Sequence, residues 1–111
     1  MVNQSLEPLD RVFAALADPT RRGLIARLHG TEGSTVSALA APLPMSLPAV
    51  LKHLDVLEGA GLIARQKTGR SVHIRLTPEP MQAAADWLER HRRFWGESLD
   101  RLADLVEGGE A

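Results

Sequence analysis

The stretch TVSALAAPLPMSLPAVLKHLDVLEGAGLIARQKTGRSVHIRL, residues 35–76, decides the fold of this chain. A short apolar segment follows Thr35, whose hydroxyl suits a helix cap, and two prolines then end that segment. Ser46 can cap a second helix, which carries apolar residues at spacings of four and three and ends near Gly61. Two short alternating segments on either side of residues 67–70 are typical of a β-hairpin.

The flanking sequence adds two helices before this stretch and one long helix after it. Asp18-Pro19 is a helix start, since Asp can cap a helix and Pro is tolerated in the first turn. After Pro78 and Pro80, apolar residues recur at nearly every 3.6 positions as far as Val106. We predict one domain over residues 1–111, mainly α-helical with a small antiparallel β-hairpin wing, which is the layout of a winged helix-turn-helix. Its predicted parts are two helices at 6–30, the helix-turn-helix at 35–58, the wing at 62–76 and a long C-terminal dimerisation helix at 79–106.

The composition is typical of a single soluble globular domain, with 111 residues, 44% hydrophobic and 24% charged. No apolar run reaches the ~20 residues that a membrane span needs. The N-terminus lacks a basic-then-apolar signal pattern, so we expect a cytoplasmic protein without membrane contact. The chain has no cysteine, which excludes disulfides and thiolate chemistry.

Positive charge is concentrated in the middle of the chain, although the net charge is −1. Residues 1–45 carry four basic and four acidic side chains and are neutral overall. Residues 46–76 carry five basic and two acidic side chains, a net charge of +3, whereas residues 77–111 carry four and eight, a net charge of −4. The positive potential lies where phosphate groups would have to be neutralised, which predicts double-stranded DNA as the partner.

The helix that starts after Ser46 corresponds to the one that enters the major groove. Its first turn offers only apolar side chains for base contact, for example with a thymine methyl group. Lys52 points away from the packed stripe of this helix. For His53, burial against the first helix of the motif and a DNA contact are equally good interpretations. The predicted DNA-contacting residues are Thr35, Ser46, Leu47, Pro48, Ala49, Lys52, His53 and, at the hairpin tip, Lys67 and Arg70.

Three arginines, Arg21, Arg22 and Arg27, are predicted on the outside of the second helix. A solvated polar face is the first interpretation, and a phosphate contact from Arg21 or Arg22 is the second. The last helix raises a different question, because about 26 residues at 1.5 Å each span ~39 Å, more than so small a domain can cover. We therefore expect a second copy to cover its apolar stripe. The predicted dimer-interface residues are Leu9, Phe13, Leu88, Trp95, Leu99 and Leu102.

Two motifs together resemble the ArsR-type family of bacterial transcriptional repressors: Ala-Asp-Pro-Thr-Arg-Arg at residues 17–22 and Lys-His-Leu-x-x-Leu-x-x-Ala-Gly-Leu at residues 52–62. The resemblance covers residues 9–106. It implies a homodimer, packed through its first and last helices, that binds a palindromic operator and represses its own or a neighbouring operon. Leu51 departs from the pattern, since many relatives have a small polar residue there. If Leu51 faces the groove, the base preference of this chain differs from theirs.

Neither a metal site nor an active site is expected. Metal sensors that the family includes typically bind through cysteines on the helix before the turn, where this chain has Val36-Ser37-Ala38, or through Asp, His and Glu on the last helix. Asp86, Glu89 and His91 occur there, but not on one face. No nucleophile elbow, glycine-rich phosphate loop or pair of catalytic carboxylates is present. We expect a regulator that is not an enzyme, needs no cofactor and does not respond to metals, and that leaves room for an unknown small-molecule inducer.

The alternative is a winged-helix dimer that mainly binds another protein or senses a small organic ligand between its long helices. The basic hairpin favours DNA binding, whereas the acidic C-terminal third leaves the alternative open. A salt titration of duplex binding separates the two, because phosphate contacts give affinity a steep negative dependence on salt.

Overall fold

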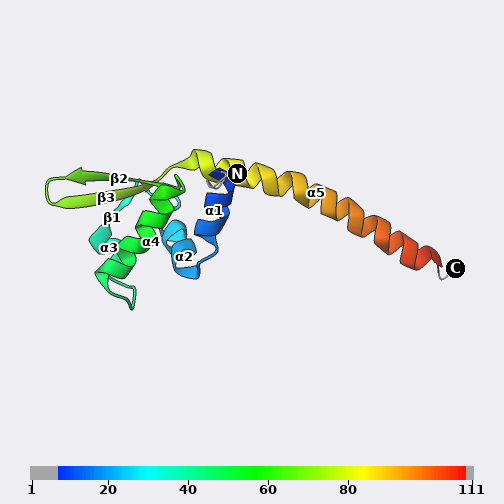
Figure 1. The fold of residues 1–111 in the computed structure, drawn as a ribbon, viewed down its shortest axis with the longest axis horizontal. Coiled ribbons are helices and arrows are strands. Elements are labelled where there is room, and N and C mark those ends of the chain that lie inside the picture. Colours follow the sequence, from blue (N-terminus) through cyan, green and yellow to red (C-terminus); the bar gives the residue numbers. More distant parts are fainter. Residues whose placement is uncertain (1–7, 110–111) are drawn as a thin grey trace, which may run out of the picture.

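The computed structural model describes residues 8–109 as five helices and a three-stranded sheet (Figure 1). This mainly helical architecture with a small antiparallel sheet confirms the predicted fold class. The predicted helical residue Leu6 lies outside the described residues. The helices are α1 (Pro8–Leu16), α2 (Pro19–Leu28), α3 (Val36–Ala40), α4 (Leu47–Gly59) and α5 (Pro78–Gly109), and the strands are β1 (Ser34–Thr35), β2 (Ile63–Thr68) and β3 (Ser71–Leu76).

Three helices begin at the capping residues that the sequence predicts. The side chain of Asp18 accepts a hydrogen bond from the Arg21 amide at 3.0 Å at the start of α2. Thr35 caps α3 and Ser46 caps α4 in the same way. Each cap satisfies an amide that has no partner within its own helix. After α4, Gly61 has φ 78°, the left-handed conformation that ends a helix at low steric cost.

The sheet has one strand more than predicted, in the order β1-β3-β2. Ser34, which lies between the predicted helices and the predicted helix-turn-helix, pairs with Ile74 in antiparallel register. Two residues are too few to give an alternating pattern, so only the tertiary pairing reveals this strand. Gly33 permits the close approach: at its φ of 125°, a Cβ would lie 2.5 Å from the Ile74 carbonyl oxygen and 2.6 Å from His73 Nε2.

The wing is a tighter hairpin than the predicted tip at residues 67–70. Its strands pair as far as Thr68 and Ser71, which leaves Gly69 and Arg70 as the turn. Gly69 has φ 61° at the first central position, as a type II′ hairpin turn requires.

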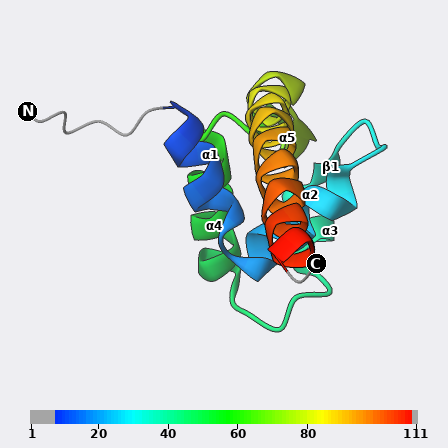
Figure 2. The same cartoon turned by 90° about the vertical axis from the view of Figure 1, so that its right-hand side faces the viewer.

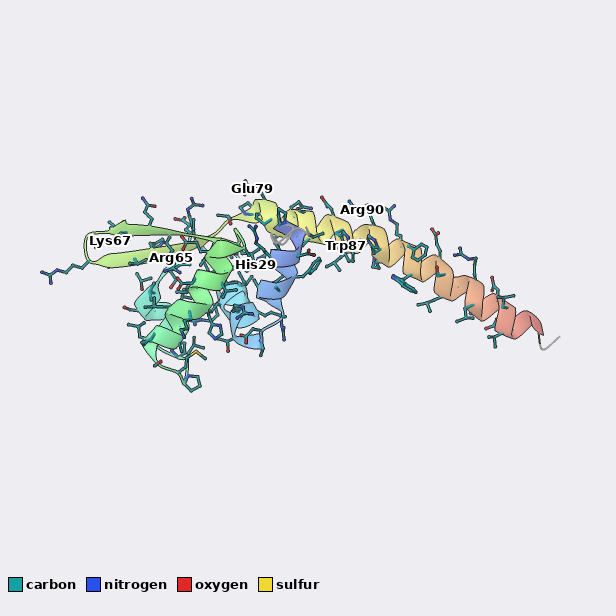
Figure 3. All side chains as sticks on the ribbon, in the orientation of Figure 1. His29, Arg65, Lys67, Glu79, Trp87 and Arg90 are labelled. Atoms are coloured by element: carbon teal, nitrogen blue, oxygen red, sulfur yellow. The ribbon has the colours of Figure 1, made fainter. Side chains whose placement is uncertain are left out.

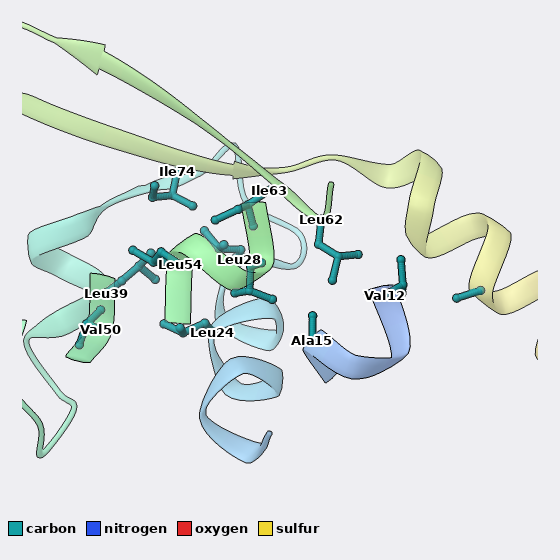
Figure 4. Close-up of a cluster of buried hydrophobic side chains, with 12 residues drawn as sticks. Val12, Ala15, Leu24, Leu28, Leu39, Val50, Leu54, Leu62, Ile63 and Ile74 are labelled. Atoms are coloured by element: carbon teal, nitrogen blue, oxygen red, sulfur yellow. The ribbon is translucent and has the colours of Figure 1, made fainter. Parts of the chain in front are cut away.

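One apolar core lies where the helices meet the base of the wing (Figure 4). The predicted stripe of α4 is fully buried, with Val50, Leu54 and Leu57 each 0% exposed. No polar or charged residue of the described chain is buried. The other buried core residues are Val12, Ala15, Leu24, Leu28, Leu39, Leu62, Ile63, Ile74 and Ala84.

Helix α5 leaves this body and extends alone (Figures 1 and 2). It has 32 residues and runs to Gly109, whereas the predicted end was residue 106. Only Ala84 of α5 belongs to the buried core, and its first part packs against α1. Within residues 8–109, no helix combines the length and apolar character that crossing a membrane requires.

Candidate nucleic-acid interface

The N-terminal turn of α4 lies at the surface of the molecule. Ser46, Leu47 and Pro48 are exposed, and Leu47 keeps 52% of its surface accessible despite being a large apolar residue. Lys52, one turn further along, is exposed on the side opposite the buried stripe. Ala49 is half-buried beside them. This end of α4 therefore presents apolar groups and one cation to solvent, the combination that the sequence predicts.

His53 lies on the flank of α4 that faces α2, and its side chain is 20% exposed. Its Nδ1 is 3.3 Å from Arg21 Nη1 and 3.8 Å from Asp18 Oδ2. Of the two interpretations of His53, this position favours partial burial over DNA contact. The neighbouring element is α2, however, and not α3, the helix against which burial was expected. The surroundings of His53 are polar, since they consist of the capping residue Asp18 and Arg21.

Asp18 is stabilised in its charged carboxylate form next to His53 and Arg21. The backbone amide of Arg21 donates to it, and this bond is the main cause that lowers the pKa of Asp18. The nearby His53 and the Arg21 side chain act in the same direction, while partial desolvation opposes them. A charged Asp18 thus caps α2 and lies beside the recognition helix.

The outer arginines of α2 form hydrogen bonds within the protein, which the sequence does not predict. Arg21 and Arg22 donate to carbonyls at the C-terminal end of α1, with Arg22 Nη1 2.8 Å from the Leu16 oxygen. Arg27 does the same for α3, with Nη1 2.7 Å from the Leu39 oxygen. The last carbonyls of a helix lack intrahelical donors and carry partial negative charge, so a guanidinium fits them well. These three side chains join helices, and Arg22 and Arg27 are also exposed to solvent. A phosphate contact from Arg21 or Arg22 stays a prediction.

The tip of the wing carries the basic residues that the sequence singles out. Lys67 and Arg70 are exposed, and within the described chain neither forms an ion pair. Figure 3 places Lys67 near the end of the hairpin. Arg75 is likewise exposed on β3. Together with Lys52, these residues give the wing and α4 four exposed cations.

Arg65 behaves differently, although it contributes to the same local charge. Its guanidinium pairs with two carboxylates of α4: Nη2 donates a hydrogen bond to Asp55, whereas Nε lies 3.1 Å from Glu58 Oε1 as an ion pair without hydrogen-bond geometry. The side chain is only 23% exposed. Asp55 and Glu58 neutralise its charge, so the positive potential of the interface comes from the four exposed cations, Lys52, Lys67, Arg70 and Arg75. The sequence does hold a signal for this inward position: Arg65 is two residues from the buried Ile63 and lies on the same face of β2.

Two further positions named from the sequence, Leu51 and Thr35, are half-buried. Leu51 is half-buried against the core, so it does not project into the space in front of α4. The change in base preference that depended on an outward Leu51 therefore has no structural basis. Thr35 is half-buried; its hydroxyl accepts from the Ala38 amide at 3.1 Å, and its backbone pairs with His73.

The predicted dimer residues divide into two groups. Leu9 and Phe13 of α1 are half-buried, and Phe13 meets Trp87 of α5 edge-to-face with centroids 5.5 Å apart. The predicted residues of α5 are open to solvent in a single chain. Their exposed fractions are 51% for Leu88, 60% for Trp95, 60% for Leu99 and 56% for Leu102.

Within residues 8–109, no group of three or more His, Asp and Glu side chains is arranged to hold a metal ion. The three candidates on α5 each have another partner. Asp86 accepts from Gln82 at 2.9 Å, Glu89 pairs with Arg92 at 2.8 Å, and His91 Nδ1 lies 2.9 Å from the carbonyl of its own helix at residue 87.

An exposed first turn of a recognition helix, flanked by a hairpin with a basic tip, is the surface through which winged helix-turn-helix proteins bind DNA. The fold and the site therefore define a DNA-binding protein of this class. Comparison with known proteins agrees: residues 16–66 match the family model described as a helix-turn-helix domain.

The chain belongs to the ArsR family of transcriptional regulators, as its two motifs predict. It is 39% identical over 99 residues to the HTH-type transcriptional regulator Rv2034 of Mycobacterium tuberculosis, covering 88% of each chain. It is 37% identical to the arsenical resistance operon repressor of Escherichia coli, covering 83% of this chain and 79% of that one. The crystal structure of the ArsR family transcriptional regulator RHA00566 has a TM-score of 0.75 at 41% identity and covers 81% of this chain and 98% of the other.

Proposed function

We propose that this regulator is a homodimeric repressor that binds a palindromic operator at its own gene or a neighbouring operon. The observation that carries the proposal is the set of exposed cations on α4 and the wing, whose charges are not taken up by acidic neighbours. Lysines and arginines placed this way neutralise phosphates on both sides of the groove that α4 enters.

In this proposal, base contacts come from the first half of α4. Leu47 is the best candidate for an apolar contact with a thymine methyl group, because a large apolar side chain exposed at 52% has no structural use there. Lys52 is the residue placed to read a base edge or a phosphate. Ser46 and Thr35 remain proposed backbone contacts through their hydroxyls, and Lys67 and Arg70 bind phosphates beside the groove. In this proposal, His53 does not contact DNA and stabilises α4 through its contacts with α2.

The proposed dimer pairs α5 with α5 of a second copy. The apolar stripe of α5 is exposed in a single chain, and a second copy would bury it. The distribution of charge along α5 favours an antiparallel arrangement of the two helices. Residues 89–93 carry a net charge of +2, whereas residues 97–107 carry a net charge of −3. Antiparallel pairing sets the basic segment of one copy beside the acidic segment of the other, while parallel pairing would set like charges together. Two copies can then place their α4 helices about one DNA turn, ~34 Å, apart.

We further propose that repression does not depend on a metal ion. The chain has no cysteine, and Asp86, Glu89 and His91 are engaged by neighbours on α5 itself. A chelator should leave operator affinity unchanged, and purified protein should hold less than about one zinc ion per dimer, because a structural or sensing site needs three or four ligands.

The alternative function, binding a protein or a small organic ligand, has one observation in its favour. An open apolar groove of about 550 Å³ runs along α5 beside Leu88, His91 and Trp95. The same side chains form the stripe that a second copy would cover, so dimerisation accounts for the groove without a ligand.

The deciding experiment is footprinting on the DNA upstream of its own gene, followed by a salt titration of the protected duplex. We expect a protected site with two-fold symmetry and an affinity that falls steeply with salt. Binding without salt dependence, or no protection together with tight binding of a protein partner, would favour the alternative.

A further inference from the structure

Arg65 lies at the point where the wing leaves the body of the protein. On β2, the preceding residues 63 and 64 are buried or half-buried, whereas residues 66–68 are exposed. The turn at Gly69 and Arg70 and the first residue of β3 are exposed as well. On the opposite strand, Val72 packs against the core and His73 pairs with Thr35 of β1, so β3 is held further out than β2. Along β2, within the described chain, Arg65 is the last residue whose side chain forms a hydrogen bond or ion pair with another element.

That element is the recognition helix. Asp55 and Glu58 are three residues apart, so they lie on the same flank of α4. One guanidinium spans both carboxylates, and within the described chain these are the only ion pairs that join a helix to the sheet. A planar fork with several fixed N–H directions constrains orientation in a way that a flexible ammonium group does not.

We propose that Arg65 is a positioning residue that fixes the direction of the wing relative to α4, and so lets the two bind one DNA duplex together. The inference rests on the proposed DNA contacts of α4 and the wing tip. Arg65 also neutralises the charge of two carboxylates. Asp55 is 67% exposed and lies three residues from Lys52. Without Arg65, the Asp55 carboxylate would repel the phosphates that Lys52 approaches.

A direct phosphate contact by Arg65 is the competing explanation. It would require the guanidinium to leave two carboxylates and a site where it is only 23% exposed. Arg75 on β3 carries the same charge on an exposed side chain and serves as a matched control for loss of one arginine from the wing. Exposed ion pairs contribute little to stability, so variants at Arg65 should remain folded.

The test compares Arg65→Met, Arg65→Lys and Arg75→Met in operator binding at fixed salt, with folding checked by circular dichroism. Arg65→Met should weaken binding by about tenfold, comparable with losing the wing's phosphate contacts, and Arg65→Lys should recover only part of this. The diagnostic readout is coupling: Lys67→Ala should weaken binding on its own, but should add nothing in the Arg65→Met background. An undiminished effect of Lys67→Ala there would overturn the proposal.

A distance measurement tests the same idea without DNA. Because the chain contains no cysteine, Val56→Cys on α4 and Thr68→Cys on the wing give a clean pair of spin-label sites. With labelled protein diluted in excess unlabelled protein, so that a dimer holds one labelled copy, we expect one narrow distance distribution, broadened by Arg65→Met and unchanged by Arg75→Met. Identical distributions in all three proteins would refute the positioning role even if DNA binding fell. If the unaltered protein binds no duplex at all, the proposed function fails, but the distance result still decides what Arg65 does.

Discussion

Arg21 ties the second helix to the recognition helix: its Nη1 lies 3.3 Å from His53 Nδ1. A guanidinium has donors only, so in this contact the imidazole nitrogen accepts. The same guanidinium donates through Nε to the Ala15 carbonyl oxygen at 2.6 Å. One side chain thus joins α1, α2 and α4, and the orientation of the DNA-binding helix depends on a residue far from the predicted contact surface.

Arg21→Met should destabilise the fold, because it leaves carbonyls of α1 and the His53 nitrogen without a donor. We expect a loss of about 1–3 kcal/mol in the free energy of unfolding, the cost of leaving partly buried polar groups unsatisfied. Urea denaturation measures it. Arg70→Met, which removes an exposed arginine from the wing tip, should leave the denaturation midpoint unchanged. Equal midpoints for the two variants would contradict the role of Arg21.

Asp18 should make stability depend on acid pH. Its pKa in the folded protein is lowered, mainly by the hydrogen bond from the Arg21 amide. The stabilisation is therefore complete above the unfolded-state pKa of about 3.9 and is lost as pH falls through the lower folded value. Asp18→Asn keeps a capping side chain but cannot titrate. Between neutral pH and about pH 3, the urea midpoint of the unaltered protein should fall further than that of this variant. An equal fall of the urea midpoint in both proteins would show that Asp18 does not cause the pH dependence of stability.

Lys52 and Lys67 should differ in how their loss affects DNA binding. Lys67→Ala removes a phosphate contact, so it should weaken all duplexes alike and reduce the salt slope by about 1. Lys52→Ala should cost about 1–3 kcal/mol on the operator and reduce discrimination against altered sites, if the side chain reads a base. Fluorescence anisotropy with operator and scrambled duplexes measures both effects. Unchanged affinity in both variants would rule out the proposed interface.

Leu99→Asp should separate the proposed dimer and abolish operator binding together. Leu99 is 60% exposed in a single chain, and a symmetric interface would bring two new carboxylates into an apolar contact. Arg101→Asp places the same group on the polar face of α5 and should remain dimeric. Sedimentation and anisotropy follow the two properties. A folded Leu99→Asp monomer that still binds a full operator with unaltered affinity would show that α5 serves another purpose.

The sequence by itself determined the order and type of the elements, because their signals are local. A hydroxyl such as that of Ser46 caps the helix that begins at the next residue, and Gly61 supplies the positive φ at its end. The buried stripe of α4 follows from spacing alone, since positions four and three apart share one helical face. The unpaired stripe of α5 was visible for the same reason, as were the two family motifs.

Tertiary structure alone decided which long side chains meet. Arg21 reaches a histidine 32 positions away, and Arg65 reaches an aspartate ten positions back on another element. Strand β1 exists only because its two residues pair with β3 across a close approach at Gly33. Periodicity records which face of an element is apolar, but it does not record the partner of a flexible polar side chain. That partner depends on how separate elements pack, and here packing makes Arg65 and the three predicted outer arginines, Arg21, Arg22 and Arg27, into links between elements.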